Sequence, residues 1–268
     1  MKRAFMINFD LRERKDTMAW LLVLAVLFLG LDYEEETTKL HVEMGMAYMS
    51  QGLLERAEAE FATALESGVS CPEAFLGLGI IKARKGDLVT ACSFLREFME
   101  QNPEDHRGPL ELGRILLRVD SAEAAHEMAN EAYLLAPSLP ETWLLMARTS
   151  IACVDSTQAR RWLLKTIDHG GDTGLQARVM LGSMMRGKGE LSEARDVLIP
   201  AARADYPPAY WGLARVYLAW EDYMRASDNM NRYLYLSPDG PWSDSARMVL
   251  DELASEGLYM TESGSAFE

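Results

Sequence analysis

The chain has 268 residues, of which 49% are hydrophobic and 25% are charged, close to the usage of ordinary globular proteins. This composition excludes a largely disordered chain and a membrane protein with many spans. Lysine and arginine number 27 against 41 aspartates and glutamates, giving a net charge of -14. We expect no nucleic acid partner, because most of the surface would repel a phosphate backbone.

The strongest apolar run lies near the N-terminus, where residues 18–31 read MAWLLVLAVLFLGL without a charge. As a helix it would span about 21 Å, less than the roughly 30 Å of a hydrocarbon core. The run predicts a short membrane anchor or the core of a signal peptide, with a buried soluble helix as the third possibility. No small residues with A-x-A spacing and no cysteine for lipid attachment follow it. We therefore expect an uncleaved anchor.

The charges around this run predict its orientation. Five basic residues precede it, whereas acidic residues dominate directly after it. The positive-inside rule then makes residues 1–17 a cytoplasmic basic segment and residues 18–31 a single span of the inner membrane. Residues 32–37 would form an acidic linker, and the rest of the chain would lie on the periplasmic side.

Beyond this segment, the same residue types recur about every 34 residues. A large residue is followed three positions on by an apolar one, and then in fixed order by a small residue, an aromatic, a turn glycine, an alanine, an aromatic and an alanine. In the first copy the series from the apolar residue on is Met44, Gly45, Tyr48, Gly52, Ala57, Phe61 and Ala64. The six copies start near residues 38, 72, 106, 140, 175 and 207. A period of this length indicates a stacked helical repeat.

Each copy predicts two amphipathic helices joined at the glycine. One hairpin alone cannot bury its apolar face, so the hairpins must stack. The expected fold is all-α: a right-handed α-solenoid of six hairpins over residues 38–240, a capping helix over 241–256 and a tail over 257–268. The pattern resembles the tetratricopeptide repeat (TPR). The third and fourth copies depart from it, because Pro109 and Ser150 replace aromatics and neither has a glycine between its helices.

Residues that usually carry catalysis lack partners at a suitable spacing. The four histidines lie far apart, and His41 occupies the large slot of a first helix, where we expect core packing. The Gly-Leu-Gly of residues 77–79 is not preceded by a strand, so it does not predict a phosphate loop. The cysteines have no C-x-x-C spacing, which leaves no disulfide or zinc site, and we interpret as packing residues Cys71, Cys92 and Cys153. No catalytic residue, metal or cofactor is predicted; an enzyme with its site in the groove is the disfavoured alternative.

The first helices of such repeats line a concave groove, and its predicted floor has an unusual charge. Counting the second, fifth, ninth, twelfth and thirteenth residue of each copy gives 30 positions, of which eight are basic and two are acidic. This balance is the reverse of the whole chain. The groove residues that we single out are Arg84, Arg107, Leu110, Arg114, Leu117, Arg118, Leu144, Arg148, Ile151, Arg186, Trp211, Arg215 and Leu218.

Arginines between apolar side chains suit a protein segment that is apolar along one edge and is acidic or ends in a carboxylate. We therefore expect a peptide segment, not a metabolite, as ligand. The alternative is that the arginines pair with acids of the second helices and only hold the superhelix together.

Three stretches resemble a particular family, the periplasmic six-repeat pilotins of type IV pilus biogenesis. They are KLHVEMGMAYMSQGLLERAEAEFATALE, ARADYPPAYWGLARVYLAWEDYMRA and RYLYLSPDGPWSDSARMVLDELASEG. The resemblance implies a non-enzymatic scaffold that helps a secretin ring assemble or reach the outer membrane. Pilotins are lipoproteins, whereas no lipobox cysteine follows Leu31, so a factor tethered to the inner membrane fits better. An envelope assembly factor for another client, in cytochrome maturation or as a translocon-associated chaperone, stays open.

Overall fold

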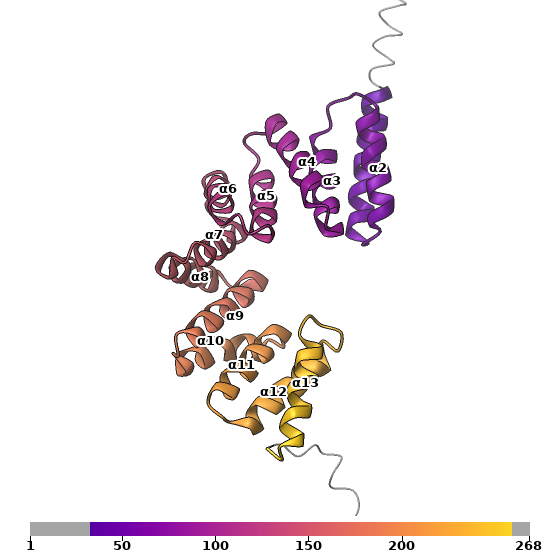
Figure 1. Cartoon of the computed structure of the whole chain (residues 1–268). Helices are drawn as coiled ribbons and strands as arrows, with labels where there is room; N and C mark the ends of the chain where they lie inside the picture. The colour runs from indigo at the N-terminus through magenta and orange to yellow at the C-terminus, as the bar shows by residue number, and fades with distance from the viewer. Residues whose placement is uncertain (1–32, 259–268) are drawn as a thin grey trace, which may run out of the picture. The chain divides into compact units, whose positions relative to one another are not determined.

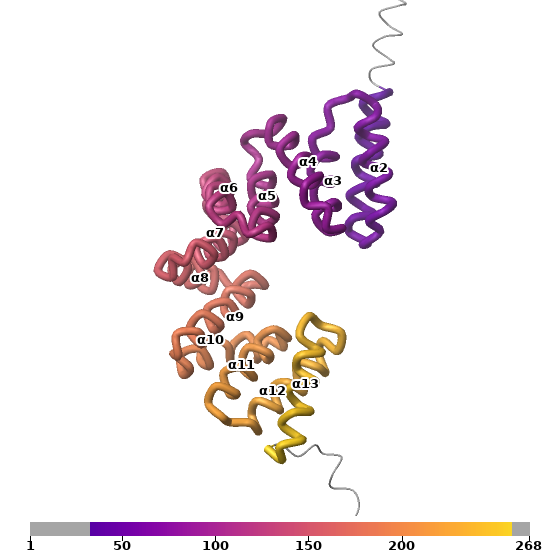
Figure 2. Tube along the Cα trace, in the orientation of Figure 1, coloured from indigo at the N-terminus to yellow at the C-terminus, as the bar shows by residue number. Residues whose placement is uncertain are grey.

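The computed structural model describes residues 33–258 and is all-helical there apart from turns and connections (Figure 1). Two compact units divide the chain after Val119. The first unit contains a helix over residues 33–50, α2 (Leu54–Glu66), α3 (Pro72–Lys85), α4 (Leu88–Gln101) and α5 (Arg107–Arg118). Within this unit each helix from α2 to α5 packs on the next, and α3 also touches α5. The trace in Figure 2 shows these helices following one another through short connections.

The second unit continues the same alternation of helices. It contains α6 (Ala122–Leu135), α7 (Pro140–Ala152), α8 (Ser156–His169), α9 (Gly171–Gly187), α10 (Leu191–Arg203), α11 (Pro207–Ala219), α12 (Tyr223–Leu236) and α13 (Ser243–Ser255). Each helix packs on its successor, and the first helices of successive pairs also touch, α7 on α9 and α9 on α11. The predicted all-α solenoid with six helix pairs and a terminal helix is confirmed.

Helix starts follow from local chemistry. The first helices α3, α7 and α11 begin at a proline, which lacks the N–H that would have no partner in a first turn. Asp87, Asp155 and Asp222 precede α4, α8 and α12, and each side chain accepts a hydrogen bond from a backbone N–H of the first turn. These carboxylates satisfy N–H groups that otherwise have no partner inside the helix.

The turn between the two helices of each pair has one conformation throughout the described repeats. Gly52, Gly86 and Gly189 have φ of 76°, 88° and 79°, in the left-handed region. The corresponding residues of the other three pairs have φ of 56°, 61° and 58° and are Asp120, Val154 and Glu221. The spacing of these six turns matches that of the predicted repeat starts. The missing glycines of the third and fourth copies therefore leave the turn conformation unchanged.

Val154→Gly is expected to raise the free energy of unfolding by about 1 kcal/mol. A left-handed residue with a Cβ costs about 1–2 kcal/mol, whereas glycine adopts this region readily. The Val154 side chain is 87% exposed, so little packing is lost. Urea unfolding followed by circular dichroism measures the difference. The matched control is Val89→Gly, at an equally exposed valine inside α4, which should instead lose up to about 1 kcal/mol; a loss in both variants would contradict the strain at Val154.

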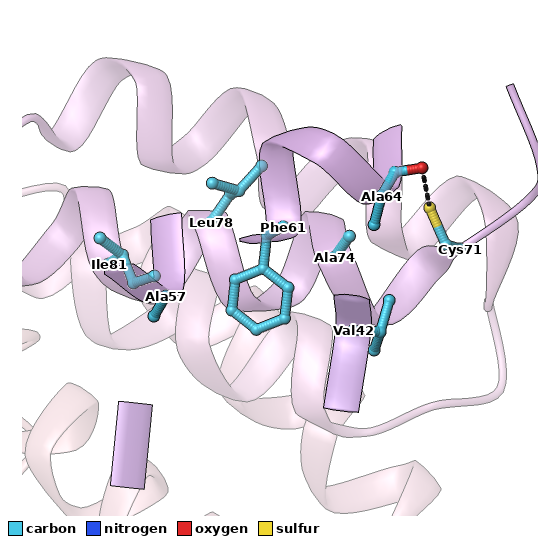
Figure 3. Close-up of a cluster of buried hydrophobic side chains, with 8 residues drawn as sticks. All are labelled: Val42, Ala57, Phe61, Ala64, Cys71, Ala74, Leu78 and Ile81. Carbon is cyan, nitrogen blue, oxygen red and sulfur yellow. Dashed lines mark hydrogen bonds between the residues drawn. The ribbon is translucent and has the colours of Figure 1, made fainter. Parts of the chain in front are cut away.

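The core of the first unit is built around Phe61, which is fully buried. Figure 3 shows its ring among the buried side chains of the neighbouring helices. A Cβ added at Gly45 would lie 2.7 Å from the ring, and one added at Gly77 would lie closer still. These two glycines thus make room for the aromatic ring; Gly45 is the small residue of the repeat pattern, whereas Gly77 is not part of that pattern. The other members of the cluster are Val42, Ala57, Ala64, Cys71, Ala74, Leu78 and Ile81.

The structure corrects the expectation of an acidic linker over residues 32–37. Residues 33–37 are helical and continue into the first helix of the repeats. Glutamate is a good helix former, and Thr38 ties this segment down: its Oγ1 lies 2.7 Å from the carbonyl oxygen of Glu34 and 2.7 Å from Ser67 Oγ beyond α2.

The expected cytoplasmic segment and membrane span, residues 1–31, lie outside the described residues, as does most of the tail, residues 259–268. Among residues 33–258, no helix combines the length and the apolar character that a membrane span requires. The predicted capping helix is present as α13, and α9 begins four residues before the predicted start at residue 175.

Two packing expectations are wrong. Cys153 is exposed, because it lies in the turn between α7 and α8; Cys71 is buried and Cys92 half-buried. His41 is not a core residue either. Its side chain is 35% exposed, and its Nδ1 lies 2.7 Å from Glu60 Oε2.

Candidate functional site

The predicted groove residues lie on the first helices, as the repeat pattern requires, but their arginines make different contacts in the two units. In the first unit, Arg107 forms hydrogen bonds to both carboxylate oxygens of Asp105, the shortest 2.6 Å, and lies 3.5 Å from Glu73. Hydrogen bonds between the two side chains lower the pKa of Asp105 and raise that of Arg107. Arg107 is therefore occupied within the chain.

The next two arginines of this unit are also engaged. Arg114 Nη1 lies 2.5 Å from Glu111 Oε1, one helical turn earlier on α5, and Arg118 Nη1 donates to the carbonyl oxygen of Ala83 at 2.7 Å. These arginines therefore make contacts within the chain, as the alternative to ligand binding predicted. Their partners, however, are not the predicted acids of the second helices. Glu73 and Glu111 lie on first helices and Asp105 precedes one, so no second helix supplies the acid.

The other predicted residues vary in how much surface they offer. Leu110 and Leu144 are only 6% and 7% exposed, because they belong to the packed side of their helices. Leu117 and Leu218 are half-buried, Ile151 is 40% exposed, and the arginines of α3 and α7, Arg84 and Arg148, are exposed. Arg114 and Arg148 lie in different units, so a ligand that both would share stays a prediction.

Three predicted residues meet at one cavity in the second unit. Arg186 on α9 and Trp211 and Arg215 on α11 line a hollow of about 110 Å³. The cavity also has a wall from Trp242, which directly precedes α13. The remaining lining residues are Val179, Gly182, Ser183, Pro208 and Gly212.

Trp242 was not predicted from the sequence to be a site residue. In the structure, several contacts fix its position. Its ring stacks on Trp211 with centroids 6.3 Å apart and planes 9° apart. Its backbone N–H donates to Tyr233 Oη at 3.0 Å. The next residue, Ser243, donates from Oγ to the carbonyl oxygen of Ser237. The one sequence signal was a tryptophan at the start of the predicted capping helix. The cap therefore contributes to the site besides closing the solenoid.

The electrostatics of this cavity differ from those of the first unit. None of its lining residues is acidic, and no carboxylate of the second unit's described residues forms an ion pair with Arg186 or Arg215. Burial, and then the positive charge of Arg215, lower the pKa of Arg186. Both guanidiniums nevertheless stay charged at neutral pH. Two like charges beside tryptophan rings form a site for an anion with an apolar neighbour.

A second cluster, also missed from the sequence, surrounds Lys165 on α8. Its Nζ lies 4.1 Å from the ring centroid of Trp143, 5.1 Å from that of Tyr133 and 5.2 Å from that of Trp162. Trp143 also donates from Nε1 to the carbonyl oxygen of Pro137 at 2.8 Å. The rings come from α6, α7 and α8, so one ammonium joins three helices by cation–π contacts. The cluster lies in the repeats whose sequences depart most from the pattern.

The cavity between α7 and α8 is larger but carries no defined chemistry. It measures about 390 Å³ and includes His126, Cys153 and Arg161. His126 Nδ1 lies 3.0 Å from Thr149 Oγ1, so one ring nitrogen is already engaged. Over the described part of the chain, no three histidine, cysteine or acidic side chains converge as metal ligands would.

Consecutive helix pairs with a left-handed turn and small residues between the helices define a helical-repeat scaffold of the protein-binding class. Residues 42–106 match the tetratricopeptide repeat family. In this stretch the match agrees with the repeat type that the sequence pattern predicted.

Solved structures share this fold at low sequence identity. Pseudomonas aeruginosa pilF is 16% identical with a TM-score of 0.63, and the match covers 81% of this chain and 99% of that one. A TPR protein from Parabacteroides merdae is 14% identical with a TM-score of 0.61, covering 85% and 95%. In the anaphase-promoting complex assembly Cut9–Hcn1 the match is 17% identical with a TM-score of 0.68, covering 81% of this chain and 43% of that one. A search of curated proteins finds no match.

Proposed function

We propose that the protein is a non-enzymatic scaffold, tethered to the inner membrane through residues 18–31, whose TPR groove holds a segment of an envelope machine during assembly. Pilus or secretin components are the proposed client. The observation that carries the proposal is the convergence of predicted groove residues, Arg186, Trp211 and Arg215, at one cavity of a protein-binding fold. Unlike Arg107 and Arg114 of the first unit, Arg186 and Arg215 form no ion pair with an acid among residues 120–258.

The choice of client rests on separate support. Three stretches of the sequence resemble pilotins, and the fold is shared with pilF over 99% of that chain. The fold by itself is common to scaffolds with many clients, so the pilus role needs a genetic test.

Removing the gene should reduce surface pili or stable secretin multimers while the amount of secretin monomer stays the same. An assembly factor acts after synthesis of its client, which is why multimers and not monomers should respond. Immunoblots of unheated and heated membranes measure multimer and monomer, and electron microscopy counts pili. Complementation by the full chain is the control. Normal pili together with normal multimers in the deletion strain would contradict the pilus role.

The tether is tested in the same strain. A version without residues 1–31, exported by an unrelated cleavable signal, should fail to restore multimers if the scaffold must stand at the membrane. Full rescue would show that the repeats act as a soluble chaperone.

A further inference from the structure

The cavity between α9, α11 and the residue before α13 has three features that together limit its ligand. Its rim carries two arginines, its wall carries two stacked tryptophans, and its volume is about 110 Å³. Each feature excludes a different kind of occupant, and we take them in turn.

The charge excludes a cation and a purely apolar group. Arg186 and Arg215 line the same hollow, and the positive charge of Arg215 disfavours that of Arg186. Neither forms an ion pair with a carboxylate among the described residues of the second unit. In the first unit, two arginines at repeat positions do form ion pairs: Arg107 with Asp105 and Arg114 with Glu111. An incoming anion would relieve the repulsion between Arg186 and Arg215, and guanidinium groups suit a carboxylate in particular, because they donate two parallel hydrogen bonds.

The size of the hollow suits a small group. A volume of about 110 Å³ has room for a side-chain end such as a carboxylate with a short methylene stem. The rings of Trp211 and Trp242 stand beside it and offer apolar surface to the neighbouring side chain of the same segment. Tyr233 Oη holds the backbone N–H of Trp242, so this wall exists before a ligand arrives.

We propose that this cavity recognises one glutamate or aspartate side chain of the bound protein segment, with Arg186 and Arg215 donating to its carboxylate and Trp211 and Trp242 covering the adjacent apolar residue. The inference rests on the proposed function, because it assumes that the carboxylate in the cavity belongs to a protein client. It adds that the capping segment, through Trp242, takes part in choosing that client.

The test uses the full-length chain and three synthetic peptides of seven residues. The first has capped ends and one central glutamate between leucine and phenylalanine, and the second has glutamine in place of the glutamate. The third carries the glutamine but ends in a free carboxylate. The affinity of each peptide is measured by fluorescence anisotropy of a label at its N-terminal end.

The glutamate peptide should bind about tenfold more tightly than the glutamine peptide, a ratio that corresponds to one good charge-assisted contact. The ratio should fall to about one in the double variant Arg186→Gln/Arg215→Gln and should shrink as salt is added. The matched control is Arg178→Gln, on the same helix α9 but outside the cavity lining, which should keep the tenfold ratio.

A second measurement separates recognition from a structural role. Because Arg186 and Arg215 repel each other in the unliganded protein, the double variant should melt at the same temperature as the wild type or higher. A lower melting temperature would show that the arginines serve folding and would overturn the proposal. Equal binding of the glutamate and glutamine peptides would overturn it too, as would an arginine-dependent preference for the free carboxylate terminus alone.

These outcomes are independent of the genetic test. A deletion strain with normal pili and multimers removes the pilus client but leaves the peptide ratio as it is. Conversely, reduced multimers in the deletion strain together with equal peptide binding would keep the scaffold function and reject this cavity as its recognition site.

Discussion

Phe61→Ala is expected to lower the free energy of unfolding by about 3–5 kcal/mol, the usual cost of removing a buried aromatic ring. Phe61 is fully buried and lies between Gly45 and Gly77, so its removal leaves a cavity in the first repeats. Repeat arrays pass such damage mainly to neighbouring repeats. Hydrogen exchange should therefore show lost protection in the helix over 33–50, in α2 and in α3. Unchanged protection there would show that the ring does not join these helices.

The same cluster offers a sharper test through Gly77. A Cβ at this position would meet the Phe61 ring well inside van der Waals contact, so Gly77→Ala alone should cost about 1–3 kcal/mol. In the background of Phe61→Ala the added methyl group meets no ring, and its cost should largely vanish, which a double-mutant cycle measures. Gly187→Ala is the matched control, because a Cβ there meets nothing within 4 Å; it should leave stability unchanged or slightly raised. Equal costs of Gly77→Ala in both backgrounds would contradict the packing shown here.

Trp143→Ala is expected to cost about 3–5 kcal/mol in the second unit, since the residue is only 8% exposed. Part of this cost should depend on Lys165, whose Nζ lies 4.1 Å from the ring centroid. A cycle with Lys165→Met, which keeps an apolar stem without the charge, should give a coupling energy of about 1–2 kcal/mol. Urea unfolding is followed by circular dichroism and not by tryptophan fluorescence, because Trp143 is itself replaced.

The control for this cycle is Lys188→Met, at an exposed lysine with no ring contact, which should change stability by no more than about 0.5 kcal/mol. A coupling energy near zero between Trp143 and Lys165 would mean that the ring stabilises by its apolar area alone. The ammonium would then not join α6, α7 and α8.

The repeat pattern predicted the helix pairs because its signals are local. Small residues such as Gly45 and Ala57 recur where one helix must approach another, and turn residues recur where the chain reverses. A search for glycine alone would miss the turns at Asp120 and Val154. The packed helices on both sides impose the left-handed conformation even where the residue disfavours it.

The predicted groove residues differ in the contacts that they make within the chain. Counting from repeat starts placed Arg186, Trp211 and Arg215 on one surface, and they do line one cavity. The same count included Arg107 and Arg114, which are paired within the chain. Sequence spacing reports the face of a helix, whereas an ion pair depends on which acid lies nearby in space.

The sequence by itself determined the repeat architecture, the phase of its helices and the reversed charge of the groove positions, because helical periodicity and small-residue spacing act within each copy. Only the tertiary structure decided that Arg107 and Arg114 form ion pairs within the chain, that Trp242 completes the cavity and that Lys165 is enclosed by three rings. These features join side chains from different helices. Their distances are set by the packing of helix on helix, and no spacing along the chain encodes them.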